Sequence, residues 1–124
     1  MSEIYFTPRE LDVMSVLWRK GSATVSEVRE GLEEELAYTT VLSALQVLEE
    51  KGFVAHEPEG RAYRYHPLVE SEKAGGSALA RIRDAVFQGS AERMFAQFVS
   101  ERALSRDELE RMQKMLTKRL KEES

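Results

Sequence analysis

The sequence contains no cysteine and only two histidines, so it cannot form disulfide bonds and offers few side chains for a transition metal. No apolar run approaches the roughly 20 residues that a membrane-spanning helix needs, and no signal peptide opens the chain. A glycine-rich phosphate loop and a nucleophile elbow are also missing. From these absences we expect a cytoplasmic protein that holds no metal or cofactor and is not an enzyme.

What is present is a short chain rich in charge. Its 124 residues suit one domain, or a small domain with an appendage, and 32% of them are charged. Residues 1–67 carry seven Lys/Arg and twelve Asp/Glu, a net charge of −5, whereas residues 68–124 carry eleven and ten, a net charge of +1. A negative domain binds a polyanion such as DNA weakly, although the local distribution of charge is a better guide than the total.

The N-terminal third predicts two helices. Thr7, Pro8 and Glu10 form a helix start with a capping box, and Gly21 ends this first helix. A short strand is expected within residues 22–25. A second helix follows, with a buried stripe of Val25, Val28 and Leu32.

Residues 38–51 predict a third helix, with Gly52 as its C-cap. Its apolar face comprises Val41, Leu45 and Leu48, with Ala44 beside them, and its opposite face comprises Thr39, Ser43, Gln46 and Glu50. A merely solvated face would be expected to carry Glu and Lys in so charged a chain. Short neutral side chains can instead approach bases, since glutamine pairs with adenine and a threonine methyl meets the thymine methyl. The pattern favours a DNA-recognition helix whose contacting residues are Tyr38, Thr39, Thr40, Ser43 and Gln46.

A hairpin is expected next, with a strand at 53–57, a turn at 58–60 and a return strand at 61–66. Arg61, beside the turn glycine, is the better candidate for a DNA phosphate or the minor groove, and Arg64 is the second choice.

Four rings of this hairpin are interpreted as structural. Tyr63 and Tyr65 share one strand face and are expected to pack into the core. His56 and His66 are expected to face each other across the hairpin, and structural histidines are favoured there over a metal site.

The composition shifts at residues 68–78, where Gly75-Gly76-Ser77 is either a flexible joint or a weak point in a longer helix. Ser90 can cap a later helix, and residues 105–108 form another capping box. About three helices in some 50 residues provide little core of their own. We therefore interpret residues 69–124 as a helical dimerisation region and residues 1–68 as a winged-helix domain. The expected interface residues are Leu79, Ile82, Val86, Phe95, Phe98, Leu109, Met112 and Leu116.

Five segments together resemble the BlaI/MecI/CopY family of penicillinase repressors. They are Thr-Pro-Arg-Glu-Leu-Asp-Val-Met…Leu-Trp (7–18), Thr-Val-Ser-Glu-Val (24–28), Ala-Tyr-Thr-Thr-Val…Leu…Leu-Glu-Glu-Lys-Gly (37–52), Gly-Arg-Ala-Tyr-Arg-Tyr (60–65) and Phe-Val-Ser-Glu…Leu-Ser-Arg-Asp-Glu-Leu (98–109). The resemblance implies a winged-helix repressor that binds a palindromic operator as a homodimer, through its third helix and its wing.

The resemblance also bears on release from DNA. Members tied to β-lactam resistance are inactivated when a membrane-bound sensor protease triggers cleavage before a Phe of the fifth helix. The matching bond is Gln97–Phe98, where those members carry Asn before the Phe. Copper-responsive members use C-terminal cysteines, which this chain lacks, so the inducing signal stays open.

The sequence therefore predicts a mainly α protein with a small β-hairpin: a winged helix-turn-helix domain plus a C-terminal helical dimerisation arm. The expected function is transcriptional repression at a DNA operator. The alternative is a winged-helix adaptor that binds other proteins and shows no specific DNA binding.

Overall fold

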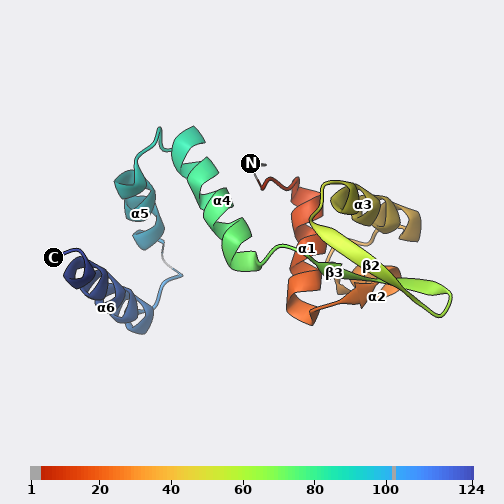
Figure 1. The fold of residues 1–124 in the computed structure, drawn as a ribbon. Helices are drawn as coiled ribbons and strands as arrows, with labels where there is room; N and C mark the ends of the chain where they lie inside the picture. The colour runs from red at the N-terminus through yellow and green to blue at the C-terminus, as the bar shows by residue number, and fades with distance from the viewer. Residues whose placement is uncertain (1–3, 102) are drawn as a thin grey trace. The chain divides into compact units, whose positions relative to one another are not determined.

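The computed structural model describes residues 4–101 and 103–124, and it divides into two compact units, Met1–Leu79 and Ala80–Ser124. Figure 1 shows the course of the chain. The elements in order are α1 (Pro8–Lys20), β1 (Ala23–Thr24), α2 (Val25–Gly31), α3 (Tyr38–Glu50), β2 (Val54–Glu59), β3 (Ala62–Pro67), α4 (Ser71–Ala85), α5 (Ala91–Val99) and α6 (Arg106–Glu122). The predicted fold class, mainly helical with a winged helix-turn-helix, is confirmed.

The first two helices begin at reciprocal caps. The Thr7 hydroxyl accepts the Glu10 amide at 3.2 Å, and the Glu10 carboxylate accepts the Thr7 amide at 2.9 Å. Thr24 and Glu27 repeat the arrangement at the start of α2. Gly21, with φ +86°, ends α1 in a conformation that side chains avoid. The predicted start and end of the first helix are confirmed.

The core of the first unit lies between three helices and the base of the sheet. Its fully or almost fully buried members are Val13, Met14, Val16, Leu17, Ala23, Val25, Val28, Val41, Leu45, Leu48, Val54 and Tyr65. The predicted apolar face of α3 is among them and is confirmed. Because α3 buries this face, its opposite face must lie at the surface.

One charged pair joins the start of α1 to the end of α3. The Glu10 carboxylate is buried and accepts two hydrogen bonds from the Lys51 ammonium, at 2.9 and 3.0 Å. Burial raises the pKa of Glu10, but the hydrogen bonds from Lys51 and from the Thr7 amide lower it more, so the net pKa is below its ordinary value. The pair fixes the C-terminal end of α3 against α1.

The sheet is antiparallel, in the order β1-β3-β2, and the β2–β3 hairpin forms the wing. Its pairing runs from Val54 opposite Pro67 to Glu59 opposite Ala62, which leaves a two-residue turn of Gly60 and Arg61. The sequence-based turn at 58–60 was therefore placed too early, because Pro58 pairs within the ladder. Gly60 alone supplies the positive φ, +61°, as the first residue of a type II′ turn requires.

The rings of the wing depart from two predictions. His56 lies opposite Tyr65, and His66 lies opposite Ala55, so the two histidines do not face each other. Tyr65 is buried as expected, but Tyr63 is 50% exposed. In Figure 1 the hairpin extends beyond the helices, and its buried residues, Val54 and Tyr65, belong to the core cluster. The exposed Tyr63 ring instead contacts His56, with ring centroids 4.7 Å apart.

The wing base continues into α4, which is one helix through Gly75 and Gly76. Trp18 donates its indole N–H to the Val69 carbonyl at 2.8 Å, and Ser77 donates to the Ile4 carbonyl at 2.9 Å. These contacts tie the first two turns of α4 into the first unit. Of the two alternatives for this segment, the longer helix is the one adopted.

The second unit contains α5 and α6 with the end of α4. Ser90 caps α5, and Ser105 with Glu108 forms the predicted capping box of α6. No residue of α5 or α6 is buried in the described part of the chain. In the same described residues, no helix is both long enough and apolar enough to cross a bilayer.

Candidate nucleic-acid interface

The outward face of α3 consists of short and mostly uncharged side chains. Tyr38, Thr39, Ser43 and Gln46 are exposed, and Thr40 is half-buried at the edge of the face. Each polar group can donate or accept hydrogen bonds at a base edge or a phosphate. The structure thus brings five predicted contact residues together on one helix.

The same face has two further members. Val47 is 41% exposed and lies one helical turn beyond Ser43, and Glu50 lies one turn beyond Gln46. Val47 is not among the predicted contact residues, because apolar side chains are expected on the buried side of a helix. Its position is visible in the sequence, since Val47 follows Ser43 by four residues.

The N-terminal end of α3 faces solvent without a side-chain cap. Its N-cap residue is Ala37, whose methyl cannot accept a hydrogen bond, whereas serine or threonine caps α1, α2, α5 and α6. The leading amides of α3 are consequently able to donate to an acceptor outside the protein. No residue from Tyr38 to Glu50 is basic, so α3 can offer a phosphate only its leading amides, the side-chain hydroxyls and the amide of Gln46.

The two arginines of the wing have different surroundings. Arg61 lies at the exposed tip, and it has no ion-pair or hydrogen-bond partner among the described residues. Arg64 lies on β3 and binds the Glu59 carboxylate through two hydrogen bonds of 2.9 Å. It also pairs with Glu27 at 3.0 Å and donates to the Ser22 hydroxyl at 3.3 Å.

Arg64 contributes to the pKa shifts of three groups, its own guanidinium included. The hydrogen bond to Glu59, and then the nearby charge of Glu27, raise the pKa of the guanidinium. The same hydrogen bond lowers the pKa of Glu59. The Thr24 amide, followed by Arg64, lowers the pKa of Glu27. All three groups are charged at neutral pH, and Arg64 connects the wing to the start of α2.

A second link joins the wing to α3. His56, on β2, contacts the Glu49 carboxylate through Nδ1 at 2.7 and 2.8 Å. Its ring also packs against Tyr63 and Tyr65. The wing is therefore attached to both helices of the helix-turn-helix, through Arg64 to α2 and through His56 to α3.

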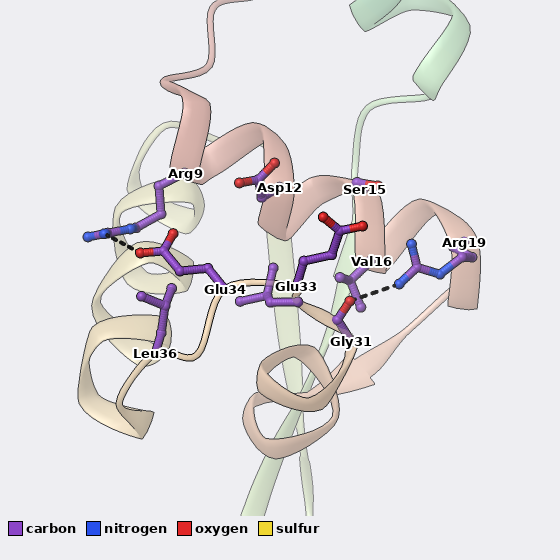
Figure 2. A pocket seen from close by; sticks show the side chains of 10 residues that line it. Arg9, Asp12, Ser15, Val16, Arg19, Gly31, Glu33, Glu34 and Leu36 are labelled. Atoms are coloured by element: carbon purple, nitrogen blue, oxygen red, sulfur yellow. Dashed lines mark hydrogen bonds and ion pairs between the residues drawn. The ribbon is translucent and has the colours of Figure 1, made fainter.

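A hollow of about 500 Å³ lies between α1 and the loop after α2, and Figure 2 shows the side chains that line it. Arg9 pairs with Glu34 at 3.7 Å, and Arg19 donates to the Gly31 carbonyl at 3.2 Å. Both cations of the hollow thus have partners within the protein. None of the predicted contact residues lines this hollow.

The residues predicted for dimerisation are at the surface. Leu79, Ile82, Val86, Phe95, Phe98, Leu109 and Leu116 are each between 39 and 61% exposed, and Met112 is half-buried. Within the second unit, Phe95 and Val99 of α5 and Leu109, Met112 and Leu116 of α6 line a shallow apolar hollow. Met115 and Leu120, which the prediction left out, are also exposed.

The Gln97–Phe98 bond lies in the last turn of α5, and both side chains are exposed. The Gln97 carbonyl accepts a hydrogen bond from the Ser100 hydroxyl at 2.7 Å. A protease that needs extended backbone would therefore have to unwind this helix end.

Comparison with known proteins shows related regulatory proteins. The methicillin resistance regulatory protein MecI of Staphylococcus aureus (strain N315) is 24% identical over 112 residues, which cover 89% of this chain and 91% of MecI. The transcriptional regulator BlaI of Mycobacterium tuberculosis (strain H37Rv) is 36% identical over 94 residues, which cover 73% of this chain and 68% of BlaI.

Solved structures agree on the fold. The solution structure of the DNA-binding domain of the repressor BlaI matches 58% of this chain and 90% of its own length, with a TM-score of 0.52 and 28% identity. A MarR family protein from Bacillus stearothermophilus matches 96% of this chain and 76% of its own length, with a TM-score of 0.51 and 24% identity, and shares the fold. The family model described as penicillinase repressor matches residues 6–118, and the chain belongs to this family.

Proposed function

We propose that this protein is a cytoplasmic transcriptional repressor that binds a palindromic DNA operator as a homodimer. The observation that carries the proposal is the outward face of α3, where exposed, short and neutral side chains stand beside a wing with one unpaired arginine. The related proteins MecI and BlaI are named as regulators, and the BlaI structure is titled as a DNA-binding domain. The net charge of −5 on residues 1–67 makes a single copy a weak binder.

In this proposal α3 lies in the major groove, and Tyr38, Thr39, Thr40, Ser43 and Gln46 contact bases and nearby phosphates. Arg61 at the wing tip contacts the backbone or the minor groove. Arg64 has its charge balanced by two carboxylates, so it contributes to DNA binding mainly by holding the wing in position. We therefore expect one wing arginine per copy, Arg61, to contact a DNA phosphate.

The second copy is held by the second unit. A unit in which α5 and α6 bury no residue has unused apolar surface, and burying that surface against an identical surface stabilises both copies. We expect the seam of a two-fold dimer at the hollow between α5 and α6, together with the exposed Met115 and Leu120. A two-fold dimer also supplies the second α3 that a palindromic operator needs.

Release from the operator is proposed to occur through this same arm. Cleavage at Gln97–Phe98, by or downstream of a membrane-bound sensor protease, would separate α6 from the rest of the arm and so weaken the dimer. The exposure of both side chains at a helix end supports access by a protease. Conversion of Gln97 to Asn offers a direct comparison with the family members that are cut at this place.

Selection of bound duplexes from a random pool by the full chain tests the proposal. We expect enrichment of a palindrome whose half-sites are about one helical turn apart. In a gel-shift series on that duplex, Ser43→Ala should weaken binding about fivefold for each lost hydrogen bond. Ser15→Ala is the matched control, because Ser15 is equally an exposed helical serine but lies on α1 in the hollow of Figure 2. Equal effects of the two substitutions would contradict the placement of the interface.

The adaptor alternative makes a different prediction in the same experiment. An adaptor enriches no duplex, and any residual DNA binding is independent of sequence. Removal of residues 80–124 tests the dimer, because the shortened chain should sediment as a monomer and lose most of its operator affinity. A shortened chain that still binds as a dimer would refute the arm as the dimer interface.

A further inference from the structure

Val47 is an apolar side chain on the face that the proposed function directs at DNA. It is 41% exposed, and its neighbours on the helix surface are Ser43 in the turn before it and Glu50 and Lys51 in the turn after it. Thr39, Ser43 and Val47 follow each other at intervals of four residues and form one line along α3. No element of the described chain covers this line.

We infer that Val47 is a specificity residue that reads the 5-methyl group of a thymine in the major groove. The inference rests on the proposed function, and it adds a base preference to it. An isopropyl group cannot hydrogen-bond, so contact with a base is favourable only where the base presents carbon, and the thymine methyl is the carbon group of the major groove. Cytosine, guanine and adenine present polar atoms that Val47 would leave without partners.

The length of α3 places this contact at a definite distance from the others. Thr39 and Val47 are eight residues apart, which is about 12 Å along a helix axis. A helix in the major groove is inclined to the DNA axis, so Thr39 and Val47 are expected to face different base pairs of one half-site. Gln46 is adjacent to Val47 and can pair with adenine. The two side chains together favour an A·T-rich step at this end of the half-site.

Because α3 has no basic residues, contacts such as those of Val47 and Gln46 become more important for distinguishing one base sequence from another. From Tyr38 to Glu50 the helix carries no lysine or arginine, so it cannot form the bidentate contact with guanine that arginine makes. Glu50, one turn beyond Gln46, brings a negative charge and ends the neutral part of the face. Base selection by this helix therefore depends on hydroxyl, amide and methyl contacts.

Removal of single methyl groups from the DNA tests the inference. The full-length protein is used to select a duplex, and each thymine of that duplex is replaced in turn by deoxyuridine, which lacks only the 5-methyl group. Fluorescence anisotropy then gives the Kd for each duplex. For the wild-type protein we expect one position per half-site at which the replacement weakens binding about fourfold, the value for one buried methyl group.

The variant Val47→Ala should weaken binding to the thymine duplex by a similar factor, and deoxyuridine at that position should then cost nothing more. Val47→Ile should keep the methyl sensitivity. Leu11→Ala is the control, since Leu11 is an exposed apolar residue of α1 and should leave the deoxyuridine profile unchanged. Equal thermal midpoints for the variants would show that the fold is intact.

Three outcomes separate the possibilities. If Val47→Ala retains the wild-type deoxyuridine profile, Val47 does not read a methyl group. If the sensitivity instead disappears in Thr39→Ser, which removes the methyl of Thr39, the reading residue is Thr39 and the inference is overturned. If the pool yields no enriched duplex at all, the proposed function itself fails and the inference falls with it.

Discussion

Replacement of Arg61 by alanine tests how an acidic domain gains affinity for DNA. Arg61 is the wing cation without a partner among the described residues, whereas Arg64 is held by Glu27 and Glu59. On the proposed function, Arg61 displaces counterions from the DNA and Arg64 does not. The two arginines should therefore differ in the salt dependence of binding, and not only in affinity.

The expected size of the effect follows from counterion release. Each neutralised phosphate contributes about 0.9 to the slope of log K against log salt concentration, so loss of Arg61 from both copies of a dimer should reduce the slope by about 1.8. Over a fourfold rise in salt, from about 50 to 200 mM, the ratio of wild-type to variant affinity should fall by about twelvefold. Anisotropy titrations with the selected duplex at several salt concentrations measure this slope directly.

Arg61→Lys and Arg64→Ala are the controls. Lysine keeps the charge, so Arg61→Lys should keep the wild-type slope. Arg64→Ala leaves Glu27 and Glu59 without their cation, so we expect weaker binding and a lower thermal midpoint with little change in slope. Equal slope changes for the two alanine variants would refute the reasoning, because Arg64 would then have to leave its carboxylates to bind phosphate. No slope change for Arg61→Ala would place the wing tip away from the DNA.

Three further predictions concern the scaffold that positions this interface. Lys51→Met should lower the free energy of unfolding at neutral pH by about 2 kcal/mol, because the buried carboxylate of Glu10 loses its cation. The native pKa of Glu10 is lowered, so this stabilisation is present above about pH 4.5 and is lost as the pH falls through the native pKa. Urea titrations should show the gap between variant and wild type closing in acid, and a gap independent of pH would contradict this. Gly31→Ala should destabilise by about 1–3 kcal/mol, because its Cβ would lie 2.9 Å from a methyl of Val16. Gly76→Ala should raise the free energy of unfolding by about 0.5–1 kcal/mol, because the added Cβ lies in open space within α4. Thermal unfolding measures both glycine variants, and midpoint shifts of the same sign would contradict these two predictions.

The parts of the fold that the sequence predicted well depend on local chemistry. A threonine followed three residues later by glutamate predicts a helix start because both hydrogen bonds close within four residues, and the structure contains both at Thr7 and Glu10. The apolar spacing of α3 predicts its buried face for the same reason, since the period of a helix places residues three and four apart on the same face. The predicted outward residues Thr39, Ser43, Gln46 and Glu50 are all exposed, although the prediction missed Val47.

The parts that the sequence could not predict depend on distant segments. Nothing near Arg64 in the sequence indicates that Glu27, 37 residues earlier, lies 3.0 Å from its guanidinium. Two adjacent glycines weaken a helix in any local estimate, yet α4 passes through them because Ser77 bonds to Ile4 and Ala74 is buried in the first unit. Contacts of this kind decide between a joint and a helix, and only the folded chain supplies them.

The negative charge of the first unit has different effects on its affinity for DNA in general and on its discrimination between DNA sequences. Non-specific binding to DNA is almost entirely electrostatic, so an acidic domain with one free wing arginine and no basic residue on α3 should bind random DNA at the weak end of the usual range, near about 10⁻⁴ M. Contacts between neutral side chains and bases depend little on salt and distinguish one sequence from another. Weak binding elsewhere on the chromosome raises the share of repressor that is available to the operator, because genomic sites compete in great excess. On the proposed function the cost is low affinity per copy, and dimerisation through the C-terminal helices would offset it, since two half-sites bound together combine their contacts.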